Sequence, residues 1–295
     1  MIKKILLLLL VVSFSIPVFA AGSKEEPSKK EPQAAVSETE NNASSLEGTV
    51  NDPRLYTPGK LTVATGDPVY PPWMMDNDPS NGEGFESALV YALAAEMGFA
   101  KEDVVWVRQT FDQGIAPGEK HYDFNIQQYS ITEERKKFVD FSHVYYQPEK
   151  VLVALSSDAL AGAKTFEDLR KLEWGATIGT SDLDYIEQVI GVKDVAVYNE
   201  MVATFQALQA NQIDATVISL PTALYVTAVQ VPEAKIAAVL PSDPNDAGFG
   251  MVFEKDNPLV DWVNEALDKI IADGVVTRLT EEYLITDKNI PEITE

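Results

Sequence analysis

The chain has 295 residues, and its 46 acidic residues against 23 basic ones give a formal net charge of −23 at pH 7. A chain this acidic is a poor nucleic-acid binder, because affinity for the phosphate backbone comes mostly from Lys and Arg. The absence of cysteine, together with only two histidines, excludes disulfides, thiol nucleophiles and metal sites built from several histidines or cysteines.

Residues 1–20 have the layout of a secretory signal peptide. Lys3 and Lys4 precede an apolar run that begins at Ile5, and the sequence Val-Phe-Ala at residues 18–20 offers small side chains for cleavage. The apolar run is shorter than the roughly 20 residues that a membrane-spanning helix needs. We therefore expect export to a periplasmic or extracytoplasmic compartment with loss of this segment; a leader retained as an anchor is the alternative.

Residues 21–58 differ sharply in composition from the rest of the chain. They are rich in Ser, Glu, Lys, Asn and Pro and contain almost no large apolar side chain. Such a segment cannot bury enough surface to offset the entropy lost on ordering. We predict a disordered polar linker.

From Lys60 onward, strand-like segments alternate with helix-like segments. Strands are expected at residues 61–65, 104–107, 123–126, 176–178 and 214–218, and helices at 84–97, 181–189, 202–208 and 259–271. The last helix is the clearest, since its apolar residues repeat at i, i+3, i+4 and i+7 and Gly274 ends it. This alternation indicates an α/β architecture.

The sequence carries no strong catalytic motif. It has no GxSxG elbow, no GxxxxGK[ST] loop and no HExxH pair. His143 lies beside Ser142, which we interpret as a surface pair, and the carboxylates are so numerous that their pairing carries no information. We predict no catalytic residue, no cofactor and no metal.

A site for an anionic group is indicated around Arg135, which follows a predicted strand. If that strand ends near Gln128 and a helix starts near Thr132, the hydroxyls of Ser130 and Thr132, the free backbone N–H groups and the guanidinium converge. Together they would hold a carboxylate. The alternative is an ordinary surface ion pair with a neighbouring glutamate.

The run SITEERKKFVDFSHVYY, residues 130–146, closely resembles the signature of the extracellular solute-binding proteins of family 3, the polar amino acid receptors of ABC importers. The similarity continues in order along nearly the whole region after Lys60. It includes LTVATGDPVYPPW, GEGFESALVYALAAEMG, TFEDLRKLEWGATIGTSDLDYI, NQIDATVISL and GFGMVFEKDNPLVDWVNEALDKIIADG.

The resemblance implies an α/β fold of two lobes, of the type II-like periplasmic-binding-protein kind, with the ligand buried between the lobes when they close. Lobe 1 would comprise residues 60–153 and 246–295, and lobe 2 residues 154–245. Two crossover strands, at residues 151–153 and 248–251, would join them.

The resemblance also assigns roles to residues. Arg135 would clamp a ligand carboxylate with help from Ser130, and Thr180 and Ser181 would add donors from lobe 2. Aromatic faces would come from Tyr70, with Trp73 and Phe111 either joining it or packing in the lobe core. Asp67 and Glu86 would either meet a ligand ammonium or serve as a turn cap and a helix-start carboxylate.

Two departures from the family pattern bear on the ligand. Many members carry, at the position of Ser219, an Asp that binds the ligand α-amino group, and a hydroxyl is a weaker partner for a cation. Gln127 and Gln128 replace small residues, and their amides would contact polar ligand atoms. We therefore expect an atypical amino acid, a derivative or another small carboxylate whose amine is held by Asp67, Glu86 or Asp182.

We predict from this resemblance a substrate-binding receptor of an ABC importer that captures a small amino-acid-like solute by lobe closure. Its partners would be that ligand and a membrane permease, with no nucleic acid, and the protein would be a monomer. The alternatives are a ligand sensor acting in trans and a cyclohexadienyl-dehydratase-like enzyme on the same fold.

Overall fold

The computed structural model describes residues 46–155, 165–284 and 290–293, which belong to one compact unit. The predicted signal peptide and the predicted linker up to residue 45 lie outside the described residues. None of the helices in the described part of the chain combines the length and the apolarity needed to cross a bilayer.

The segment that follows residue 45 forms a series of turns. Leu55 is buried in the core of the first lobe. The Asp52 carboxylate accepts hydrogen bonds from the backbone N–H groups of Gly48 and Arg54. Residues 46–58, the last part of the predicted linker, are thus packed onto the folded region.

The first lobe is built on a mixed sheet. In the described part of the chain this sheet has five strands in the order β2-β1-β3-β10-β4, namely β1 (Leu61–Gly66), β2 (Val104–Gln109), β3 (Phe124–Asn125), β4 (Val139–Phe141) and β10 (Val252–Glu254). β1 runs parallel to β2 and β3, whereas β10 is antiparallel to β3 and β4. Every residue of β1 is buried, as expected of a parallel strand covered on both faces.

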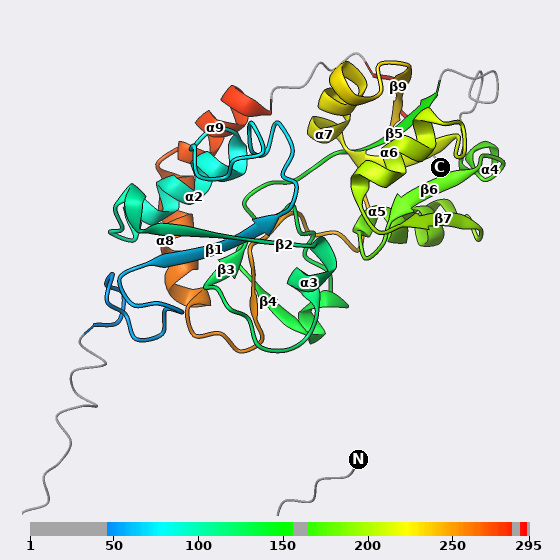
Figure 1. The fold of residues 1–295 in the computed structure, drawn as a ribbon. Coiled ribbons are helices and arrows are strands. Elements are labelled where there is room, and N and C mark those ends of the chain that lie inside the picture. The colour runs from blue at the N-terminus through cyan, green and yellow to red at the C-terminus, as the bar shows by residue number, and fades with distance from the viewer. Residues whose placement is uncertain (1–45, 156–164, 285–289, 294–295) are drawn as a thin grey trace, which may run out of the picture. The chain divides into compact units, whose positions relative to one another are not determined.

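Helices α2 (Phe85–Glu96), α8 (Val260–Ala272) and α9 (Val275–Tyr283) pack against one another and share a core with the first sheet (Figure 1). The predicted helix at 259–271 is α8, and Gly274 separates it from α9. The φ angle of Gly274 is 75°, a left-handed conformation that glycine adopts without strain. The shorter helices are η1 (Lys101–Asp103), α3 (Phe111–Ile115) and η2 (Arg135–Lys137).

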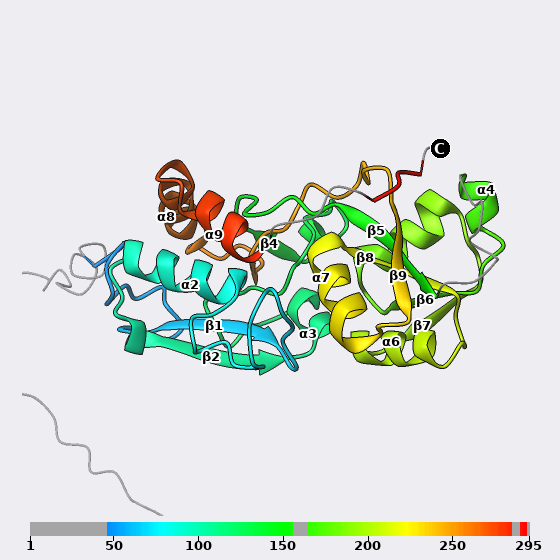
Figure 2. The ribbon, with the colours of Figure 1, turned by 90° about the horizontal axis from the view of Figure 1, so that it is seen from above.

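The second lobe is built on another mixed sheet (Figure 2). Its five strands among the described residues follow the order β7-β6-β8-β5-β9: β5 (Lys150–Leu155), β6 (Trp174–Thr177), β7 (Val195–Tyr198), β8 (Ala215–Ser219) and β9 (Ala234–Val239). The helices are α4 (Phe166–Leu169), α5 (Ser181–Asp184), η3 (Tyr185–Ile190), α6 (Met201–Gln209), α7 (Leu220–Tyr225) and η4 (Val226–Gln230).

Between β4 and β10 the chain passes between the lobes twice. It leaves the first sheet after β4, enters the second at β5, and returns through residues 240–251 to β10. On the return, Phe249 forms bridges to Ser130 and Tyr146. Two α/β lobes connected in this way confirm the predicted fold class. Residues 151–153, expected as a crossover, are part of β5 inside the second sheet.

The last described residues pair with the second lobe. The prediction placed residues 246–295 in lobe 1, but the Val239 N–H donates to the carbonyl of Pro291 and the Ile293 N–H donates to the carbonyl of Val239. Ile293 is buried in the core of the second lobe. The physical reason is that β9 is an edge strand, whose unpaired backbone groups accept a further segment.

Candidate ligand-binding site

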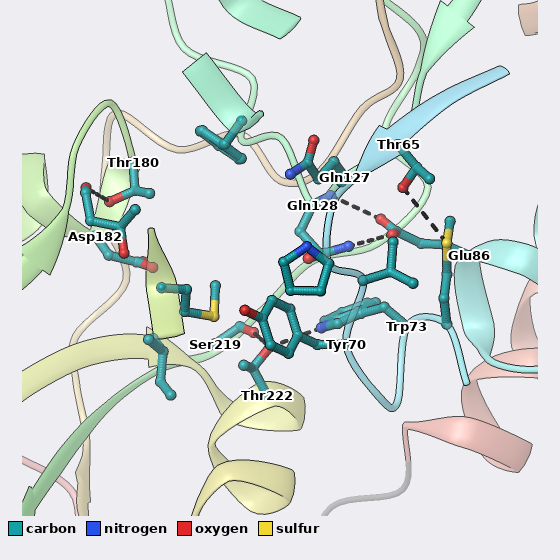
Figure 3. Close-up of a pocket in the computed structure, with 18 of the residues that line it drawn as sticks. Thr65, Tyr70, Trp73, Glu86, Gln127, Gln128, Thr180, Asp182, Ser219 and Thr222 are labelled. Atoms are coloured by element: carbon teal, nitrogen blue, oxygen red, sulfur yellow. Dashed lines mark hydrogen bonds between the residues drawn. The ribbon is translucent and has the colours of Figure 1, made fainter. Parts of the chain in front are cut away.

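A pocket between the two lobes is lined by residues of both (Figure 3). The empty space within it is about 950 Å³, open solvent at its mouth included. It brings together most of the predicted site, namely Asp67, Tyr70, Trp73, Glu86, Phe111, Gln128, Thr180, Ser181 and Ser219. The other predicted residues, Ser130, Thr132 and Arg135, lie outside its lining.

The pocket forms where parallel strands end. In the first lobe, the carboxyl ends of β1, β2 and β3 supply residues 65–70, 109–111 and 127–128. In the second lobe, the ends of β6 and β8 supply residues from 177–182 and 218–222. Ligands of open α/β sheets bind outside the carboxyl ends of the strands, because the loops there converge.

Tyr70 and Trp73 belong to the loop after β1, but they have different surroundings. Tyr70 is only partly buried, and burial followed by the charge of Glu200 raises the pKa of its hydroxyl. Trp73 is 1% exposed and packs edge-on against Phe249, with ring centroids 5.7 Å apart. Its indole N–H donates to the hydroxyl of Thr222 on the second lobe at 2.8 Å. Trp73 is therefore a core residue and an interlobe contact at once.

Glu86 enters the pocket wall because α2 begins close to the loop after β1. The Glu86 N–H donates to the carbonyl of Trp73 at 2.9 Å. A Cβ atom on the preceding Gly84 would lie 2.6 Å from the same carbonyl oxygen, so only glycine permits this approach. The Glu86 carboxylate is fully buried and accepts hydrogen bonds from Gln128 and Tyr145. Burial, opposed by these donors, raises the pKa of Glu86 to about 7.

The guanidinium of Arg135 lies behind the pocket wall and joins the lobes. It donates to the carbonyl of Ser130 at 2.7 Å and to the carbonyl of Gly179, on the second lobe, at 2.8 Å. Its Cζ atom lies 5.5 Å from the centre of the Phe111 ring, a cation–π contact. Thr132 accepts a hydrogen bond from the Arg135 backbone N–H at 3.2 Å. Burial lowers the pKa of Arg135, which keeps its charge at neutral pH.

Ser130 and Ser181 also connect the lobes, since their hydroxyl oxygens are 2.8 Å apart. The Ser130 hydroxyl is 2.6 Å from the carboxylate of Asp246, on the segment that returns to the first sheet. This places Ser130 in an interlobe hydrogen-bond network rather than in the pocket lining.

Lys150, the first residue of β5, is a pocket residue that the sequence analysis missed. Its ammonium is 2.8 Å from the Asp182 carboxylate, 3.3 Å from that of Asp246 and 3.1 Å from the Ser181 hydroxyl. Burial lowers the pKa of Lys150, but the charges of the two aspartates outweigh it and the pKa is raised. The feature of the sequence that could have indicated its role is a lysine at the first position of an otherwise apolar strand.

The hydroxyls of Ser219 and Thr180 are already engaged. The Ser219 oxygen is 2.9 Å from the Thr222 hydroxyl. Thr180 caps α5, because its hydroxyl oxygen accepts a hydrogen bond from the Leu183 N–H at 3.2 Å. It also donates to the carbonyl of Thr177 at 2.7 Å.

One edge of the pocket is acidic. Asp67 is largely exposed and forms an ion pair with Arg108 at 3.1 Å. Glu200 faces it from the second lobe, and burial followed by the charges of Asp112 and Asp67 raises the pKa of Glu200. In the described part of the chain, no cluster of three or more His, Asp or Glu side chains is arranged to hold a metal ion.

The family model for bacterial extracellular solute-binding proteins, family 3, matches residues 61–286. The chain belongs to this family. A probable histidine-binding protein of Campylobacter jejuni is 28% identical over 251 residues, which cover 83% of this chain and 90% of that protein.

Solved structures of relatives share the fold. An ancestral arginine-binding protein bound to arginine has a TM-score of 0.63 and 28% identity, covering 77% of this chain and 99% of that one. An ancestral amino acid-binding protein described as a precursor of cyclohexadienyl dehydratase has a TM-score of 0.63 and 26% identity, covering 77% and 96%. These findings confirm the predicted family and the two-lobe fold, and they make this chain a solute-binding protein.

Proposed function

We propose that this solute-binding protein captures an amino acid in the pocket between its lobes and delivers it to the membrane permease of an ABC importer. The observation that carries the proposal is a pocket lined by the strand ends of both lobes in a member of this family. The names of relatives support an amino acid as the ligand, since they include histidine-binding and arginine-binding proteins.

The contacts across the pocket suggest how capture works. Separation of the lobes would break the hydrogen bonds from Trp73 to Thr222, between Ser130 and Ser181, and from Arg135 to the carbonyl of Gly179. A ligand bound to both walls adds interactions that exist only when the lobes are closed. It therefore shifts the population toward the closed form, which a permease can distinguish from the open form.

We propose Arg135 as the partner of the ligand carboxylate. A guanidinium has five N–H donors, and the bonds to Ser130 and Gly179 use two of them. It lies against Phe111, and Gly179 immediately precedes Thr180; both Phe111 and Thr180 line the pocket. A carboxylate that takes the place of the Gly179 carbonyl would form a charge-assisted bond, which is stronger than the one it replaces.

We propose binding without chemical conversion. The histidine-binding and arginine-binding relatives are named as binding proteins, and one relative of known structure is described as a precursor of a dehydratase. Incubation of the protein with its bound amino acid, followed by NMR, should show the same compound after many hours. Accumulation of a product would contradict this part of the proposal.

A thermal-shift screen of the common amino acids tests the ligand class. A ligand present at 100 times its dissociation constant should stabilise the protein by about 2.7 kcal/mol. If no amino acid raises the melting temperature or gives heat on titration, the proposal is wrong. For the partnership with a permease, deletion of the gene should reduce uptake of the labelled amino acid by cells.

We also propose that the protein is exported, because residues 1–20 resemble a signal peptide and the matched family is extracellular. Fractionation of cells followed by N-terminal sequencing tests this. Protein found in the cytoplasm with an intact first residue would contradict export.

A further inference from the structure

The aromatic loop, residues 67–77 after β1, carries two aromatic side chains of the pocket that are held in different ways. Trp73 is 1% exposed and packs against three other rings of the first lobe and its return segment. Tyr70 lines the pocket and is only partly buried (Figure 3). Among the described residues, neither a side-chain hydrogen bond nor a ring contact holds Tyr70. The position of its ring therefore depends on the backbone of the loop.

Arg108, near the end of β2, ties the two ends of the aromatic loop together. β2 is parallel to β1, and Arg108 is paired with Thr65, two residues before the loop begins. The Nη2 atom of Arg108 donates to the carboxylate of Asp67 at 3.1 Å and to the side-chain oxygen of Asn77 at 2.5 Å. Its Nη1 atom donates to the carbonyl of Asn77 at 3.4 Å. One planar guanidinium thus holds the first and the last residue of the loop, because its donors form a fork.

Asn77 carries this restraint to the residue beside Tyr70. Its side-chain oxygen also accepts a hydrogen bond from the backbone N–H of Val69 at 3.0 Å. The φ angles of Asp76 and Asn77 are 56° and 53°, in the left-handed region that residues other than glycine rarely adopt. A backbone of this kind persists where surrounding contacts hold it, and the bonds of Asn77 to Arg108 and Val69 are such contacts.

Arg108 itself does not belong to the pocket lining, whereas Asp67, Val69 and Tyr70 do. Its side chain is 26% exposed, and its hydrogen bonds within the described ranges go to Asp67 and Asn77. The contacts of Arg108 therefore reach the ligand site through the loop. A loop with several conformations lowers the apparent affinity in proportion to the fraction of molecules that are competent to bind.

We propose that Arg108 is a positioning residue for ligand binding: together with Asn77 it fixes the aromatic loop in the conformation that keeps the Tyr70 ring in the pocket wall. The loop is then ordered before the ligand arrives, so no binding energy is lost in ordering it. This inference rests on the proposed function and adds to it a residue outside the pocket that sets the affinity.

Hydrogen exchange of the ligand-free protein tests the order of the loop directly. Arg108→Met removes all three hydrogen bonds of the guanidinium, so the amides of residues 67–77 should exchange faster than in the unmodified protein, while those of β1 should not. Asn77→Gly keeps the left-handed backbone but removes the shared side-chain oxygen. It should loosen the same residues, and it replaces Arg108→Met if that variant does not fold.

Calorimetry with L-arginine and L-histidine tests the consequence for binding. Arg108→Met should lower the affinity about fivefold to tenfold, as expected if about a tenth to a fifth of the molecules hold the loop correctly. Arg108→Lys keeps the positive charge but lacks the fork, so it should restore little of the lost affinity. In the Tyr70→Ala background, Arg108→Met should lower the affinity by less than about twofold, because the ring that the loop positions is absent.

Arg54→Met is the matched control. The Arg54 side chain is 24% exposed, pairs with Asp52 at 2.7 Å and donates to the carbonyl of Pro258 at 3.3 Å, but neither it nor these partners line the pocket. Whatever this variant costs in stability, it should keep the ligand affinity of the unmodified protein and the exchange rates of residues 67–77.

The possible results separate this inference from the function beneath it. If the unmodified protein binds neither probe nor any other amino acid, the proposed function fails, and hydrogen exchange still decides whether Arg108 orders the loop. Exchange that is unchanged in both Arg108→Met and Asn77→Gly would overturn the inference whatever the ligand.

Three results in calorimetry would also overturn it while the receptor function stands. Full affinity in Arg108→Lys would mean that charge alone explains the loss. An undiminished effect of Arg108→Met in the Tyr70→Ala background would mean that Arg108 does not act through Tyr70. A loss in Arg54→Met as large as that in Arg108→Met would mean that the effect is not specific to the loop.

Discussion

The indole N–H of Trp73 donates a hydrogen bond of 2.8 Å to the hydroxyl of Thr222, and this bond joins the two lobes at the inner wall of the pocket. Trp73 belongs to the loop after β1 and Thr222 to the first turn of α7. The rest of the Trp73 ring is held by Phe85, Tyr146 and Phe249. A rigid aromatic cluster in one lobe thus supplies a single polar contact to the other.

Trp73→Phe should weaken ligand binding with little loss of stability. The substitution keeps most of the aromatic contacts and removes the interlobe bond, so the closed form loses about 1 kcal/mol, or roughly a fivefold loss in affinity. Calorimetry with the ligand found in the thermal-shift screen measures this. Trp174→Phe is the matched control, because the Trp174 indole donates at 2.9 Å to the carbonyl of Leu169 within one lobe. An equal loss of affinity in the control would refute the interlobe explanation.

Lys150→Met should destabilise the protein strongly. It leaves the carboxylate of Asp246, which is 4% exposed, and that of Asp182 without their shared cation. Removal of one partner from a buried ion pair costs about 3–5 kcal/mol. Lys269→Met is the control, because the Lys269 side chain is 57% exposed and its bond to Glu96 lies at the surface. That change should have little effect on stability. Chemical denaturation of both variants measures the two changes in the free energy of unfolding. A loss in Lys150→Met as small as that in Lys269→Met would contradict a stabilising role for the buried ion pairs of Lys150.

The affinity for arginine should rise as the pH increases from about 6 to 8. Burial raises the pKa of Glu86 to about 7, so this acid is mainly neutral below that pH and anionic above it, and a cationic ligand favours the anion. The titratable groups that face Glu86 are Tyr145 and Tyr129, whose pKa values burial raises well above 10, so neither titrates in this range.

Calorimetry of arginine binding across this pH range measures the effect, and Glu86→Gln should remove most of the pH dependence. An affinity that stays constant in the unmodified protein, or a slope that persists in Glu86→Gln, would contradict the assignment to Glu86.

Arg135→Ala should weaken arginine binding far more than agmatine binding, because agmatine is arginine without its carboxylate. Loss of a charge-assisted hydrogen bond should reduce the affinity for arginine by roughly tenfold to a hundredfold. The variant should still fold, although the carbonyls of Ser130 and Gly179 lose their donor. Titration of both ligands into both proteins gives the comparison. Equal losses for the two ligands would show that Arg135 serves lobe closure and not the carboxylate.

The strongest local patterns in the sequence were enough to predict much of the fold. The apolar periodicity of α8 and the glycine that ends it predicted that helix, and alternating strand and helix segments predicted the α/β class. These features depend on neighbours in the chain, which a sequence displays directly.

The pocket residues drawn from the loops after β1 and β8 were expected from the family pattern, whereas Lys150 was not. Its importance depends on Asp182 and Asp246, which are distant in sequence and meet it only in the folded chain. The pairing of residues 290–293 with β9 was missed for the same reason, because it depends on which strand forms the edge of the second sheet.

The sequence by itself therefore determined the chain's class, its family and most of the segments that form the pocket, because periodicity, turn chemistry and motif order are local properties. Only the tertiary structure decided which charges in the pocket are neutralised. Glu86 and Lys150 look equivalent to dozens of other charged residues in the sequence, and their difference arises from burial and from partners brought together by folding. The uncompensated charge of Glu86 is a property of the assembled pocket wall.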